Sequence, residues 1–211
     1  MQPLNLLEKY PGYFSAESFP ETLVIADPAY FVSIHATGSF TDHAFVGHIK
    51  ALTSVAHMLK EKFDNTDQAF EVSVLEALYW YDEEKYGFVE IPDIFSKLPL
   101  DKLEYRLMIR IPDYITKDDI AWAVKSIGFD DEELASAIEL FERTEGQTVQ
   151  MLHLGPFQEE KTTLLQLQDY MDNHGLIKAG VHHEIYLVDF LEEQVDSDLR
   201  TILREQVEIN T

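Results

Sequence analysis

Two glutamates interrupt otherwise apolar and aromatic stretches, and they are the side chains best suited to chemistry. Glu184 lies in HHEIYLVDF and Glu76 lies in VLEALYW. A carboxylate among apolar side chains is costly unless it is hydrogen-bonded or contacts a ligand, and such groups often act as bases or charge partners. We therefore expect Glu184, with Glu76 as its substitute, to be hydrogen-bonded or to contact a ligand. The alternative for both is a solvated glutamate at the rim of a strand.

Aromatic residues accompany both glutamates. Strand alternation puts Glu76 and Trp80 on one face and Tyr79 on the other. Aligning LYWYD with IYLVD matches Tyr79 with Tyr186. Aligning the two glutamates instead matches Trp80 with Val188, so the sequence leaves open which face lines a ligand site. The candidate aromatic walls are Phe40, Tyr79, Trp80, Phe157 and Tyr186, although an aromatic cluster is equally typical of a core.

Other catalytic patterns are absent from the sequence. It contains neither G-x-x-x-x-G-K-[ST] nor G-x-G-x-x-G for phosphates, and neither H-E-x-x-H nor G-x-S-x-G. A metal at His182 and His183 would need His153 or His35 from other strands, a spacing with no specificity, and ordinary strand histidines are the alternative. The absence of cysteine excludes a thiolate zinc site and a cysteine nucleophile. We expect no metal and no cofactor.

Hydrophobic periodicity predicts the elements that position these residues. Residues 30–36, 69–81 and 103–111 are typical of strands, and residues 41–63 have the spacing of an amphipathic helix. We expect a helix that begins at an N-cap at Thr116, and a second helical segment at residues 130–141. After Gly146 the order repeats: strand and turn at 148–157, helix at 162–176 ending at Gly175, and strands at 182–190 and 199–209. Four prolines within the first 28 residues indicate an arm with short turns.

The two halves also share local sequence. IHATGSF matches LHLGPF, LYWYD matches IYLVD, and LEYRLMIRI matches LRTILREQV. We predict an α+β fold in which two pseudo-twofold βαββ repeats form one antiparallel sheet, with helices on one side and a ligand groove between the halves. The arm spans 1–28 and the domain 29–211, with repeat one at about 29–112, connecting helices at about 116–144 and repeat two at about 147–211. Common strand and turn chemistry is the alternative explanation of the short matches.

The charge balance bears on partners. Thirty-nine acidic residues against 16 basic ones give a formal charge of -23, so the phosphate backbone of nucleic acid is repelled. Solubility explains this charge, and attraction of a cationic or electron-poor ligand is the alternative. No apolar run approaches the ~18 residues of a membrane span, and the start MQPLNLLEKYPGYF does not have the pattern of a signal peptide. With the lack of cysteine, these features predict a cytoplasmic protein with no membrane partner.

Residues 20 to 209 resemble the GyrI-like small-molecule-binding proteins, which are related to the effector-binding domains of multidrug-responsive regulators. The resemblance rests on HEIYL with Glu184, LHLGPF, VLEALYWYD and LEYRLMIRIPDYIT. It implies that Glu184 projects into the groove between the halves and meets cationic or aromatic ligands. No DNA-binding helix-turn-helix precedes the matched region in this sequence, which departs from the regulators.

The standalone branch of that family implies a reaction. The tryptophan-bearing first-half strand resembles members that open the cyclopropane ring of DNA-alkylating compounds with water inside an aromatic cage, a detoxifying hydrolysis without a cofactor. On this resemblance Glu184 orients water, and the five aromatic residues are candidates for the cage. The alternatives are a protein that only binds or sequesters such compounds, and a module that binds a protein partner, since some relatives act on DNA gyrase. No residue here selects that partner.

The charge generates a first prediction. We expect no measurable DNA affinity at physiological salt, because a chain of net charge -23 repels the phosphate backbone. Fluorescence anisotropy with a labelled duplex at several salt concentrations measures it. A salt-sensitive, submicromolar complex would overturn the prediction.

Overall fold

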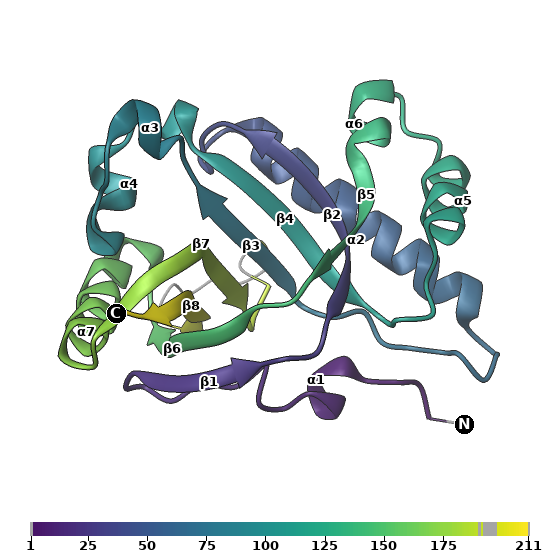
Figure 1. The fold of residues 1–211 in the computed structure, drawn as a ribbon. Coiled ribbons are helices and arrows are strands. Elements are labelled where there is room, and N and C mark those ends of the chain that lie inside the picture. Colours follow the sequence, from purple (N-terminus) through teal and green to yellow (C-terminus); the bar gives the residue numbers. More distant parts are fainter. Residues whose placement is uncertain (1, 190, 192–197, 211) are drawn as a thin grey trace.

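The computed structural model describes residues 2–189, 191 and 198–210. Within this part of the chain, one antiparallel sheet has eight strands in the order β1-β6-β8-β7-β3-β4-β2-β5 (Figure 1). The strands are β1 Glu21–Ile25, β2 Ala29–Thr37, β3 Leu75–Trp80, β4 Glu104–Ile111, β5 Ile138–Arg143, β6 Gly146–Leu154, β7 Leu176–Tyr186 and β8 Arg200–Ile209. The fold is therefore the predicted α+β class.

One short helix precedes the first strand, and the others lie in the connections between strands. They are α1 Leu6–Lys9, α2 His43–Phe63, α3 Glu83–Tyr86, α4 Ile94–Lys97, α5 Lys117–Ile127, α6 Glu132–Ala137 and α7 Glu160–Asn173, with short 3₁₀ turns at Ile91–Asp93, Leu100–Lys102 and Phe157–Glu159. Thr116 caps α5 as predicted, because its side chain accepts from the backbone N–H of Asp119. No helix in the described ranges has both the length and the apolar character to cross a membrane.

The strand order contains the predicted two-fold repeat. β3, β4 and β2 follow one another outward from the centre of the sheet on one side, and β7, β8 and β6 do so on the other. At equivalent turns, the Gly38 N–H donates to the Leu103 carbonyl at 2.9 Å, and the Gly155 N–H donates to the Leu199 carbonyl at 3.0 Å. Both glycines have positive φ, 147° and 108°, which residues with a Cβ rarely adopt.

The ladder register decides between the two alignments that the sequence allows. Tyr105 lies two residues after Leu103 and opposite Tyr79, while Thr201 lies two residues after Leu199 and opposite Tyr186. Tyr79 and Tyr186 are therefore equivalent. Two residues before each tyrosine stand Ala77 and Glu184, which face each other where β3 pairs with β7. The pseudo-twofold axis passes through this pair.

The two long helices cover the same face of the sheet. The buried side of α2 packs on Ile34, Tyr79 and Leu107 from β2, β3 and β4. The buried side of α7 packs on Met151 and Leu203 from β6 and β8. Leu203 lies opposite Glu184, and Glu184 lies opposite Ala77, so these side chains project to one side. We call this the helix face of the sheet.

Several elements differ from the sequence predictions at the sheet edges. Residues 21–25 of the predicted arm form β1, which pairs with β6. The last residues of the segment 130–141, which is expected to be helical, belong to strand β5 (138–143) instead, because pairing with β2 outweighs a weak local helix preference. The strand predicted from residue 69 begins at Leu75. Phe190, at the end of the predicted strand 182–190, lies outside the described residues.

The N-terminal arm covers the face opposite the helices. Leu6, Tyr13 and Phe14 form a cluster with Ile185 and Ile202 of β7 and β8. Next to them the Arg110 guanidinium of β4 lies over the rings of Tyr10 and Tyr13, at 4.1 and 4.6 Å from their centroids. These apolar and cation–π contacts hold the arm against the sheet.

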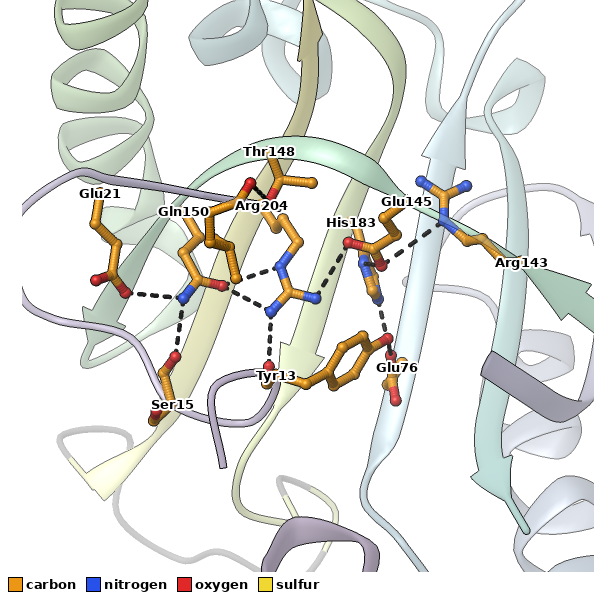
Figure 2. A network of polar contacts seen from close by, with 11 residues as sticks. Tyr13, Ser15, Glu21, Glu76, Arg143, Glu145, Thr148, Gln150, His183 and Arg204 are labelled. Atoms are coloured by element: carbon orange, nitrogen blue, oxygen red, sulfur yellow. Dashed lines mark hydrogen bonds and ion pairs between the residues drawn. The ribbon is translucent and has the colours of Figure 1, made fainter. Parts of the chain in front are cut away.

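A buried polar network lies beneath the arm (Figure 2). Arg204 of β8, with 0% of its surface exposed, donates to the Tyr13 carbonyl at 2.6 Å, to Gln150 Oε1 at 2.7 and 3.0 Å, and to Glu145 Oε2 at 3.2 Å. His183 lies between two carboxylates, 2.7 Å from Glu145 and 2.9 Å from Glu76. Burial alone would raise the pKa of Glu145, but His183 and Arg204 hold it well below its usual range. The buried carboxylate of Glu145 is thus stabilised by the groups around it, His183 and Arg204.

This dependence generates the second prediction. Arg204→Ala should lower the Tm by roughly 6–20 °C, because removal of one partner from a buried ion network leaves Glu145 uncompensated, at a cost of about 3–5 kcal/mol. Arg200→Ala is the matched control, since Arg200 is an exposed arginine on the same strand. Thermal unfolding followed by circular dichroism compares them. Equal Tm values for both variants would refute the role given to Arg204.

Candidate functional site

A cavity of about 460 Å³ opens on the helix face, above the junction of the two repeats. Both halves line it. Repeat one contributes Tyr79 and the aromatic rings of Phe40, Phe45 and Phe95, and repeat two contributes Phe157, Glu160, Glu184 and Tyr186. The volume lies within the roughly 300–1,000 Å³ that is usual for sites of small molecules.

The floor of the cavity is formed by β3 and β7 at the pseudo-twofold axis. Glu184, 4% exposed, accepts a hydrogen bond from the Tyr186 hydroxyl at 2.7 Å. The oxygens of Tyr79 and Tyr186 lie 3.0 Å apart. Burial, reinforced by the charge of Glu184, raises the pKa of both tyrosines well above the ordinary value. Both hydroxyls therefore keep their protons and form a chain that ends on Glu184.

His182 holds Glu184 from the other side. Its Nε2 lies 3.1 Å from Glu184 Oε1, and its Nδ1 lies 2.5 Å from Glu205 Oε1 on β8. Burial disfavours the imidazolium, but Glu205 and Glu184 outweigh it and raise the pKa of His182 to about 10. At neutral pH the ring therefore carries both protons and donates one to each carboxylate. Glu184 thus receives two fixed hydrogen bonds, which orient its carboxylate.

A second carboxyl group belongs to the same cavity. Glu160 is the first residue of α7, lines the cavity and is 6% exposed. Its Oε1 is buried and has no hydrogen-bond partner among the described residues. Burial, followed by the negative charge of Glu184, raises the pKa of Glu160 well above its usual range. The cavity therefore combines a carboxylate with a carboxylic acid.

The aromatic walls follow the two-fold symmetry in part. Phe40 and Phe157 each stand two residues after the equivalent turn glycines, and Phe157 meets Tyr186 edge to face with centroids 5.9 Å apart. Phe95 of α4 meets Phe40 at 5.7 Å and Tyr79 at 5.4 Å, both nearly perpendicular. Perpendicular rings support one another and leave ring faces and edges available to a planar ligand.

The structure brings together five of the seven residues proposed from the sequence: Phe40, Tyr79, Phe157, Glu184 and Tyr186. Glu76 and Trp80 do not join them, because they alternate with Tyr79 along β3 and project to the opposite face. There Glu76 accepts from the Tyr13 hydroxyl at 2.6 Å, and Trp80 stacks on His35 with centroids 5.1 Å apart.

Sequence reasoning missed Phe95 and Glu160 in the cavity and Glu205 beneath it. Phe95 belongs to a four-residue helix too short to show periodicity. Glu160 looks like an ordinary acidic residue in a first helical turn, a place that favours glutamate anywhere. Glu205 had one available signal, since LREQV places an acidic side chain on the face of Leu203, among apolar neighbours.

Comparison with known proteins finds neither a matching family model nor a matching curated protein. Among solved structures, a hydrolase from Listeria innocua is 23% identical with a TM-score of 0.78, covering 97% of this chain and 100% of that one. An uncharacterized conserved protein from the same organism has the same identity and coverage and a TM-score of 0.82. The C-terminal domain of EcmrR is 12% identical with a TM-score of 0.56, covering 90% of this chain and 97% of that one.

The chain shares its fold with these solved structures, in keeping with its resemblance to the GyrI-like proteins. The match extends over nearly the whole chain for the Listeria proteins, so β1 and the arm belong to the shared architecture. At these identities the comparison shows the fold alone, and the chemistry must be argued from the side chains.

The charged His182 generates the third prediction. Because its folded pKa, about 10, lies above the unfolded value of 6.5, its contribution to stability is complete below pH 6.5 and is lost as the pH rises towards 10. We expect the Tm to decline over this range in the wild type, and the decline to be much smaller in His182→Gln. His57→Gln, at an exposed position of α2, is the control. An imidazole signal of His182 that titrates near pH 6.5 by NMR would contradict the prediction.

Proposed function

We propose that this protein binds a planar aromatic or cationic xenobiotic in the cavity and hydrolyses compounds that carry an activated cyclopropane ring. One observation carries the proposal: Glu184 lies at the floor of an aromatic cavity, oriented by the hydroxyl of Tyr186 and the imidazole of His182. A carboxylate with fixed orientation is suited to position water or to pair with a positive centre. Aromatic walls suit a flat ligand.

The walls support binding. Phe40 and Phe157 stand at opposite repeats and line the same cavity as Phe95. Edge-to-face ring pairs contribute about 0.5–1.5 kcal/mol beyond the area they bury, and a ligand ring in the cavity would make such contacts. Faces of aromatic rings also attract positive charge, whether it belongs to the ligand or develops at a reacting carbon.

The reaction needs only groups that the cavity contains. Glu184 would take a proton from a water molecule, whose oxygen bonds to a cyclopropane carbon while one ring C–C bond breaks. The electron pair of that bond moves into the conjugated part of the substrate, which takes up a proton, so that one water is added in all. The aromatic walls stabilise the positive character that develops at the attacked carbon. A solved structure with this fold is named as a hydrolase, which is in keeping with the proposal.

A second candidate function is binding without turnover. It is favoured by the two hydrogen bonds that Glu184 accepts, because they fix its carboxylate in one orientation, in which it can pair with a cationic group of a ligand. In that case the protein would sequester aromatic cations. A gyrase-binding module is the remaining alternative, and we find no feature of the described residues that selects a protein partner.

The fourth prediction separates these functions with Glu184→Gln, a nearly isosteric change that removes the charge. For a hydrolase, the ligand still binds by stacking while turnover falls by roughly 10²- to 10⁴-fold, the usual contribution of a general base. For a binder of cations, the loss appears in the Kd, about 10- to 100-fold, from roughly 1.5–3 kcal/mol for a hydrogen bond to a charged group.

The measurements are a mass spectrum that follows addition of one water to a cyclopropane-bearing alkylator, the Kd of the unreacted compound, and the Tm of the same variant. Glu208→Gln, at an exposed position of β8, is the matched control. Unchanged turnover together with unchanged binding would remove Glu184 from the proposed site.

A further inference from the structure

Glu160 has no role in the steps assigned to Glu184, although it lines the same cavity. A buried carboxyl oxygen without a hydrogen-bond partner costs free energy, and Oε1 of Glu160 is such an atom among the described residues. The neighbouring Glu159, which precedes the first residue of α7, is exposed. A ligand in the cavity that Glu160 lines would give its carboxyl group a hydrogen-bond partner.

We propose that Glu160 is the proton donor of the cavity: its carboxylic acid hydrogen-bonds an acceptor oxygen of the ligand and protonates that oxygen when the ring opens. This inference rests on the proposed hydrolysis and deepens it. It names an acid to match the base, and it defines the part of the substrate that must face α7.

The two carboxyl groups have different surroundings. Glu184 accepts hydrogen bonds from Tyr186 and His182. Oε1 of Glu160 has no donor among the described residues, and burial, followed by the charge of Glu184, raises the pKa of Glu160. The positive charge of His182 opposes this rise, as does the N-terminus of α7, but the pKa remains raised.

Two carboxyl groups whose environments separate their proton affinities are a common arrangement for an acid and a base. The other ionisable groups that line the cavity are Lys161, Tyr79 and Tyr186. Both tyrosines keep their protons, and the Lys161 ammonium lies 2.7 Å from Asp93, to which it is paired. Glu160 therefore combines a releasable proton with a place in the lining of the cavity.

The step can be written for a cyclopropane conjugated to a carbonyl group, the kind of compound that the proposed hydrolysis takes. Glu184 takes a proton from water, and the water oxygen bonds to a ring carbon. The ring C–C bond breaks, and its electron pair moves through the conjugated system to the carbonyl oxygen. That oxygen takes the proton of Glu160 and becomes a hydroxyl. One water has been added, and transfer of a proton from Glu184 to Glu160 through solvent restores both groups.

The test compares Glu160→Gln, which keeps a neutral donor but cannot release a proton, with Glu159→Gln as matched control. The substrate is a spirocyclopropyl cyclohexadienone. We expect Glu160→Gln to bind it within about 2-fold of the wild type and to lose at least about 10² in kcat. In the wild type kcat/KM should fall at high pH as Glu160 ionises. In Glu160→Gln this fall should disappear, and only the fall that follows loss of the His182 proton, towards pH 10, should remain. Unchanged turnover, or the same alkaline fall in both proteins, would overturn the inference.

A second measurement does not depend on turnover. A carboxyl group whose pKa is raised on folding makes stability fall as the pH rises above its unfolded value of about 4.5. Glu160→Gln should therefore have a higher Tm than the wild type at pH 7, by at least about 3 °C, and the gap should close near pH 4.5. The infrared carbonyl band of a protonated carboxyl group should be present in the wild type at pH 7 and absent in the variant.

These readouts separate the two proposals. A wild type that forms no product refutes hydrolysis as the proposed function, and with it the transfer of the Glu160 proton. A wild type that forms product, with a Glu160→Gln variant that shows no Tm gap and no change in the infrared band, refutes the proton donor alone. Product formation, a Tm gap and a lost alkaline fall together support both.

Discussion

The pairing of β3 with β7 is the interaction on which the rest of the structure depends. It joins the two repeats at the centre of the sheet, and its register sets Ala77 opposite Glu184 on the pseudo-twofold axis. A shift by one residue would send every side chain of one strand to the other face. Tyr186 and Glu184 would then leave the cavity, so the site exists only in this register.

The same strand builds two different environments. On the helix face β7 contributes His182, Glu184 and Tyr186 to the cavity and its support, and on the opposite face it contributes His183 and Ile185 to the contacts beneath the arm. The buried ions around Arg204 therefore fix the position of the strand that carries the proposed site (Figure 2). The arm is distant in sequence from the residues of the cavity. It packs on the opposite face of the same strands and so supports the cavity from behind.

Periodicity and local similarity were sufficient to predict the paired repeats, the two long helices and five residues that line the cavity. The face of Glu76 and Trp80 could not be predicted, because alternation relates residues within a strand and only the register across β4 and β7 says which set faces the helices. β5 is an edge strand that forms through pairing with β2, a contact far away in the sequence. Phe95 and Glu160 can be assigned to the cavity only once the positions of α4 and α7 over the sheet are known.

The symmetry of the fold contrasts with the asymmetry of its charges. At the positions where repeat two has His182, Glu184 and Glu205, the same register gives repeat one Leu75, Ala77 and Ile109. The first half of the cavity is therefore aromatic and apolar, and the ionisable floor comes from the second half. Binding of polar groups in a low-dielectric site requires matched partners, whereas apolar groups require only contact. A ligand should accordingly enter in one orientation, with its reactive or charged end over β7 and its flat apolar part towards Phe40 and Phe95. The two repeats supply two similar walls, and three positions that are apolar in one repeat and ionisable in the other make the cavity directional.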